Sequence, residues 1–110
     1  VPGGPVHVVV MQDRRCYDAN KLMPPFNLLL DCGAATQNIV LAAHAYGLGG
    51  CWLTFSDVMR ERLIKHYSIP EHYDVVTYVD MGWPDQSPCP IWRCGVEEAV
   101  VYRSLSNMKK

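Results

Sequence analysis

The sequence predicts an α+β layered domain, in which a central buried helix packs on a mixed sheet. Two observations predict this class. Three short runs are rich in β-branched and aromatic residues, as strands are. Two helical segments alternate with these runs along the chain, which favours layers of helix and sheet. The chain has 110 residues, enough for one thin core, so residues 1–110 are treated as a single domain.

Three segments are predicted to be strands. His7 to Met11 reads HVVVM and follows a stretch of proline and glycine. Cys51 to Phe55 is a short apolar run, and Tyr73 to Met81 (YDVVTYVDM) is the clearest strand. Asp13 to Pro25 holds charges, an asparagine and a proline pair, so it is predicted to be a loop or an irregular turn.

Asn27 to about Tyr46 is predicted to form a long helix that is apolar on nearly every side. Spacings of three and four residues define its expected buried stripe: Leu28, Cys32, Ala35, Ile39, Ala42, Ala43 and Tyr46. Gly47 should end the helix, because glycine adopts the left-handed conformation at little cost. So small a core cannot cover such a helix alone, so we expect a homodimer. Gln37 and Asn38 should then hydrogen-bond the facing subunit or, as the alternative, a ligand.

A second helix is predicted from Asp57 to about His66. Ser56 is a good N-cap, an acid stands in the first turn, and bases stand in the last. After the strand that ends at Met81, the tail from Asp85 to Arg93 is rich in proline and is expected to be extended. Val96 to Tyr102 fits either a strand or a helical turn.

The composition is that of an ordinary globular chain. Of its residues, 49% are hydrophobic and 19% are charged, and the net charge is −1. The chain therefore has no excess of basic residues to attract it to nucleic acid or an anionic membrane. The five cysteines form an odd set, which favours a reduced, cytoplasmic compartment, and Cys32 and Cys51 stand in apolar runs where cysteine is usually buried. Cys89 and Cys94 lack the second ligand pair of a structural zinc site, so no metal site is predicted.

Three motifs occur in order along the chain. The first is AATQNIVLAAHAYGLGGCWL, residues 34–53; the second is IPEHY, residues 69–73, leading into the strand; the third is MGWP, residues 81–84, followed by Arg93 and VEE, residues 96–98. In this order and spacing they resemble the C-terminal half of the FMN-dependent nitroreductase family.

This resemblance implies a partial α/β/α layered sandwich in a homodimer that holds FMN at the subunit interface. It also implies ping-pong hydride transfer from NAD(P)H to a small-molecule acceptor, either a nitroaromatic, a quinone or a flavin. By match, Leu53, Thr54 and Phe55 would lie along the flavin edge. Arg93 would pair with the FMN phosphate, which a guanidinium binds well. No catalytic side chain is implied, because the flavin carries the chemistry.

Two alternatives stay open at this point. The arginine/serine-rich and asparagine–proline motifs of the family's N-terminal half do not occur in this sequence. The chain could therefore be a non-catalytic dimeric interaction module that has lost the flavin site. It could also be one part of a split enzyme, completed by a separate polypeptide. The sequence does not distinguish NADH from NADPH as the donor, nor one acceptor from another.

Overall fold

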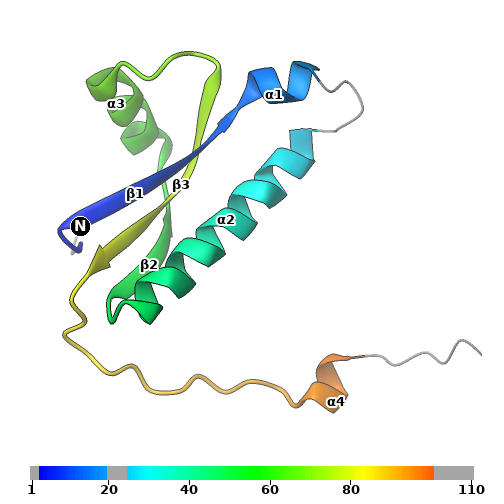
Figure 1. The fold of residues 1–110 in the computed structure, drawn as a ribbon, viewed down its shortest axis with the longest axis vertical. Helices are drawn as coiled ribbons and strands as arrows, with labels where there is room; N and C mark the ends of the chain where they lie inside the picture. The colour runs from blue at the N-terminus through cyan, green and yellow to red at the C-terminus, as the bar shows by residue number, and fades with distance from the viewer. Residues whose placement is uncertain (1–2, 20–24, 101–110) are drawn as a thin grey trace, which may run out of the picture.

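A computed structural model describes residues 3–19 and 25–100 of the chain. Figure 1 shows a small sheet with one long helix lying across it and an extended tail that runs away from the sheet. The elements follow in the order β1 (Val6–Asp13), α1 (Arg14–Ala19), α2 (Pro25–Ala45), β2 (Gly49–Thr54), α3 (Asp57–Tyr67), β3 (Tyr73–Gly82) and α4 (Val96–Ala99). The α+β class and all three predicted strands are confirmed, within two residues at each end.

β3 is the central strand of the sheet that the described residues form. The order is β1-β3-β2, and β3 pairs antiparallel with both neighbours, placing Val79 opposite Val8 on one side and Trp52 on the other. β1 and β2 therefore run in the same direction on either side of β3. Both strand pairs of the described sheet are therefore antiparallel, whereas a mixed sheet was expected. β1 and β2 run parallel to each other but do not pair, because β3 lies between them.

α2 packs one side of its cylinder on the sheet. Cys32, Thr36 and Ala43 are buried there. The Thr36 hydroxyl donates to the Cys32 carbonyl at 2.6 Å, so the buried polar group is satisfied within the helix. Small residues permit this close approach: a Cβ placed on Gly50 of β2 would lie 3.6 Å from the Ala43 Cβ. The predicted helix is confirmed, and α2 ends as expected at Gly47, which has φ of 76°.

The predicted buried stripe of α2 is partly wrong. Ala35, Ala42 and Tyr46 are exposed, while Thr36 is fully buried. The opposite side of the helix presents a stripe of exposed residues at spacings of three and four: Leu30, Ala34, Gln37, Leu41 and Ala45. A helix that is apolar all round carries no periodic signal to show which side faces the sheet. The sheet surface selects the side with the smaller residues instead.

α3 begins and ends as the sequence predicts. The Ser56 hydroxyl accepts from the Met59 backbone N–H at 3.3 Å, and Ser68 closes the helix in the left-handed conformation. Side chains of α3 line a cavity together with Val9 and Tyr78. Because neighbouring strand residues point to opposite faces, Tyr78 lies on the face away from Val79 and α2. The sheet thus has α2 on one face and α3 over the other.

The prediction of a loop or an irregular turn from Asp13 to Pro25 is wrong. This segment contains α1, and α2 already begins at Pro25; residues 20–24 lie outside the described part of the chain. The Asp13 carboxylate accepts from the Arg15 backbone N–H at 3.0 Å, as an N-cap residue does. Proline is common at the first position of a helix, which explains the start of α2. α4 shows that Val96–Ala99 is helical and Val100 is extended, and residues 101 and 102 of the segment left open in the sequence lie outside the described residues.

The cysteines are all free in the structure. Cys32 is buried as expected, and burial, followed by the nearby Asp31 charge, raises the pKa of its thiol. Cys51, expected to be buried, is exposed on β2 because this strand lies at the edge of the sheet. Among the described helices, none is long and apolar enough to cross a membrane.

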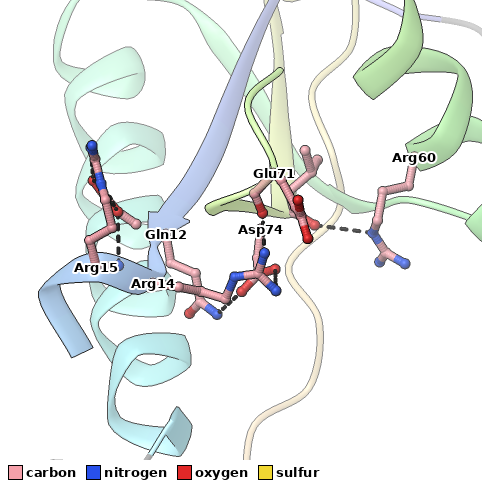
Figure 2. Close-up of polar contacts among 8 residues, drawn as sticks. Gln12, Arg14, Arg15, Arg60, Glu71 and Asp74 are labelled. Atoms are coloured by element: carbon pink, nitrogen blue, oxygen red, sulfur yellow. Dashed lines mark hydrogen bonds and ion pairs between the residues drawn. The ribbon is translucent and has the colours of Figure 1, made fainter. Parts of the chain in front are cut away.

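A polar corner joins the end of β1 to the turn before β3, as Figure 2 shows. The Gln12 amide donates to the Asp74 carboxylate at 2.8 Å, and the Arg14 guanidinium donates to the Glu71 carbonyl. Arg15 pairs with Asp13 at 2.6 Å. These contacts hold the start of α1 against the sheet.

Pairing with Arg15 should keep the Asp13 carboxyl group ionised to low pH. Hydrogen bonding to Arg15 lowers the pKa of Asp13 to about 2 from its usual 3.8. Since the pKa is lowered in the folded state, the stabilisation is complete above about pH 4. It is lost as the pH falls through 2. An NMR titration of the Asp13 carboxyl carbon should show this midpoint, and Arg15→Gln should move it back toward 4. A midpoint near 4 in the unaltered chain would contradict the pairing.

Candidate flavin-edge site

Leu53, Thr54 and Phe55 lie together where β2 ends. Thr54 is exposed, and Leu53 and Phe55 are half-buried. Among the described strands, β2 pairs only with β3, so its outer edge carries backbone groups with no strand partner. A strand edge of this kind can offer backbone N–H groups to a bound ligand. The structure thus brings three of the four predicted site residues to one place.

Thr77 of β3 holds this end of β2, and the sequence analysis missed it. Its hydroxyl donates to the Leu53 carbonyl and accepts from the Trp52 indole N–H at 2.7 Å. Trp52 in turn packs toward α2, since a Cβ on Gly33 would lie 3.6 Å from its ring. Thr77 is therefore a positioning residue for the strand that carries the site. A threonine that alternates with Val75 and Val79 along the strand was the available signal.

Phe55 packs on Tyr78, toward the α3 face of the sheet. The two ring centroids are 4.6 Å apart and the planes are tilted by 35°. Aromatic pairs in such offset arrangements stabilise each other. The Phe55 ring is thus engaged within the protomer, while the backbone of Thr54 remains at the strand edge.

Arg93 lies on the extended tail, apart from the end of β2 within one protomer. Residues 83–95 run away from the sheet and lead to α4 (Figure 1). Arg93 is exposed and makes no hydrogen bond or ion pair with any described residue. Arg60 of α3 differs from Arg93, because its guanidinium donates to the Val75 carbonyl at 3.1 Å (Figure 2). It also donates to the Asp57 carboxylate at 2.8 Å. The Arg93 charge is available for an external anion.

The chain belongs to the Nitroreductase family, whose defining sequence pattern matches residues 2–83. This confirms the resemblance drawn from the three motifs. Among curated relatives, an NADH dehydrogenase/NAD(P)H nitroreductase of Methanothermobacter thermautotrophicus is 33% identical over 90 residues. The match covers 80% of this chain and 44% of that protein. A protein of the same description from Archaeoglobus fulgidus is 35% identical over 72 residues, covering 63% of this chain and 41% of the relative.

Solved structures show the same fold. An NADH dehydrogenase/NAD(P)H nitroreductase of Parabacteroides distasonis is 27% identical, with a TM-score of 0.67, over 89% of this chain and 55% of that one. A nitroreductase of Desulfovibrio desulfuricans, solved in complex with FMN, has a TM-score of 0.70 at 24% identity, over 89% of this chain and 54% of that one. The chain spans a little under half the length of the curated relatives it matches.

Proposed function

We propose that this chain is a subunit, or part of a subunit, of an FMN-dependent NAD(P)H oxidoreductase of the nitroreductase type. Its acceptor would be a nitroaromatic, a quinone or a flavin. Membership of the family supports an oxidoreductase. The observation that carries the proposal is the free edge of β2, which ends at an exposed Thr54 and is anchored by Thr77. Five free cysteines favour the cytoplasm as its location.

The described residues fit one side of a flavin site. Leu53 and Thr54 would offer backbone groups to the ring edge, and Arg93 would bind the phosphate through its unpaired guanidinium. When bound, FMN supplies the hydride-transfer chemistry. The protein's part is to orient the ring along β2, to exclude water and to neutralise the phosphate charge. Since Arg93 lies apart from β2 in one protomer, we propose that the complete site combines residues from two chains.

The homodimer is proposed on the exposed face of α2. Leu30 and Leu41 are 56% and 57% exposed, and Tyr46 is 81% exposed at the end of the same helix. Soluble monomers rarely leave so continuous an apolar surface uncovered. The tail adds exposed Trp83 and Trp92, side chains that are enriched in protein interfaces. A second copy of the chain would cover these surfaces.

The cofactor proposal is tested by mixing the purified chain with FMN and recording the flavin absorbance after desalting. Bound flavin is expected, and a colourless protein that leaves FMN fluorescence unquenched would contradict the proposal. Arg93→Ala should weaken FMN binding about tenfold by removing one charge-assisted contact. It should leave riboflavin binding unchanged, because riboflavin has no phosphate. Arg62→Ala, which removes an exposed cation of α3, is the matched control and should have no effect.

A second candidate function is a dimeric interaction module without catalysis. The position of Arg93 favours it, since within one protomer the tail carries this residue away from Leu53, Thr54 and Phe55. Assays with NADH or NADPH and a quinone separate the two candidates. Turnover supports the enzyme, whereas a stable dimer without turnover supports the module.

A further inference from the structure

A cavity of about 870 Å³ lies between α3 and the sheet, on the face away from α2. Its walls are mostly apolar and aromatic, with Val9, Met11, Phe55, Met59 and Leu63 among the lining residues. Cavities of this size with a few converging polar groups are typical of small-molecule sites. Within residues 3–19 and 25–100, no lysine or arginine lines it. These walls therefore suit a flat apolar molecule without a full charge.

Tyr78 places a polar group in this cavity. The side chain is only 7% exposed, and its ring packs beside Phe55 on the cavity wall. The phenolic hydroxyl makes no hydrogen bond with any described residue. The hydroxyl oxygen itself is not sealed from solvent, so water or a ligand in the cavity can supply its partner. The cavity is the place from which a ligand could supply that partner.

His7 is the second polar group, and Asp80 fixes how it is held. His7 of β1 stands opposite Asp80 of β3 in the strand register, and its Nδ1 contacts the Asp80 carboxylate. Asp80 is 6% exposed, and its other oxygen accepts from the Gly4 backbone N–H at 3.1 Å. Glycine is required at position 4, since a Cβ there would lie 2.1 Å from the Met81 carbonyl oxygen. A neutral imidazole that turned its Nδ1–H toward this carboxylate would keep Nε2 as an acceptor, on a side chain that is 53% exposed.

Two complementary groups therefore meet at one cavity wall. The His7 and Tyr78 ring centroids are 6.2 Å apart, and His7 lines the cavity as Tyr78 does. Tyr78 offers a donor and His7 offers an acceptor, Nε2, that no described residue occupies. A ligand hydroxyl satisfies both at once, because it donates one hydrogen bond and accepts another. A carboxylate would bring a second negative charge near Asp80, and a plain hydrocarbon would leave both groups unpaired.

We propose that this cavity binds a fused-ring phenol. The aromatic rings would lie against Phe55 and the α3 side chains Met59 and Leu63. The ligand hydroxyl would donate to His7 Nε2 and accept from the Tyr78 hydroxyl. The cavity shares Phe55 with the proposed flavin edge, but its test uses no flavin, so failure of the redox proposal and failure of this one are distinguishable.

The test is isothermal titration calorimetry of the full chain, without FMN, using 2-naphthol and 2-methoxynaphthalene. The two probes share their rings and one oxygen, but only 2-naphthol can donate a hydrogen bond. We expect 2-naphthol to bind about threefold more tightly, the net effect of one hydrogen bond to His7, whose side chain is 53% exposed and can otherwise bond water. No binding of 2-naphthol, or equal binding of the two probes, would overturn the proposal. If a polypeptide segment is the true occupant of this cavity, 2-naphthol should not bind.

Two variants assign the contacts. His7→Phe keeps an aromatic ring but removes the acceptor, so the preference for 2-naphthol over the methoxy compound should disappear. Tyr78→Phe should weaken both probes about tenfold, since each can accept from the Tyr78 hydroxyl. Tyr73→Phe makes the same change on β3 outside the cavity lining and should leave both affinities unaltered. Unchanged binding in both cavity variants would reject the proposed contacts, and the comparison of probes in the unaltered chain does not depend on the variants folding.

Discussion

A Leu41→Glu substitution is expected to dissociate the proposed homodimer into monomers. Leu41 lies one helical turn from Gln37, the central residue of the exposed stripe that runs along α2 from Leu30 to Ala45. A carboxylate in the centre of an apolar interface must give up its hydration without gaining a partner. Central apolar residues also contribute most of the binding energy of an interface. We expect the dimer dissociation constant to rise more than a hundredfold.

Sedimentation velocity at micromolar concentration measures this change. Val58→Glu is the matched control: Val58 is 59% exposed, much like Leu41 at 57%, but lies on α3. Glutamate is well tolerated in the first turn of a helix, so this variant should remain folded and dimeric. A monomer in the unaltered chain would refute the dimer. Equal dissociation in both variants would show that the interface is not the face of α2.

Thr77→Val is expected to destabilise the chain and to loosen the end of β2. Valine keeps the shape of threonine and its preference for strands, but it removes the hydroxyl that joins Trp52 to Leu53. Two hydrogen bonds are lost, and the Leu53 carbonyl and the Trp52 indole lose their partners. We expect the free energy of unfolding to fall by about 2 kcal/mol. Because β2 carries Thr54, any flavin binding should weaken as well.

Chemical denaturation followed by tryptophan fluorescence tests this prediction. Thr77→Ser is the matched control, since serine keeps the hydroxyl. This variant should retain most of the stability that Thr77→Val loses. Trp52 emission should change in the valine variant alone, because the environment of its indole N–H changes. Equal destabilisation by valine and serine would show that packing of the threonine methyl group, and not the hydrogen bonds, holds β2.

Several elements could be predicted because their causes are local. Ser56 caps α3 through its own hydroxyl, and Gly47 ends α2 because its φ is positive. The strand β3 was predicted within one residue, since its β-branched and aromatic residues favour extended backbone. α1 was missed even though its cause is also local. Its cap depends on one aspartate, and the charges around Asp13 resembled those of a loop.

The site could be predicted only in part. The position of Leu53, Thr54 and Phe55 at the end of a strand followed from the motif, and the structure brings them together. Thr77 and Tyr78 were missed because their roles come from the pairing of β3 with β2 and from packing under α3. The contacts that define these roles, to Trp52, Leu53 and Phe55, join residues more than 20 positions apart in the chain. Asp80 was missed for a similar reason, since its contact with His7 joins the first and last strands of the sheet.

By itself, the sequence determined the family and the order of the three strands with α2 and α3, because these depend on local preferences and on motifs within the chain. Tertiary structure alone decided which side of α2 faces the sheet, the antiparallel pairing around β3, and the contacts of Asp80. The physical reason is that these outcomes depend on surfaces contributed by distant segments. A helix that is apolar on all sides shows which side is buried only when a sheet has packed against it.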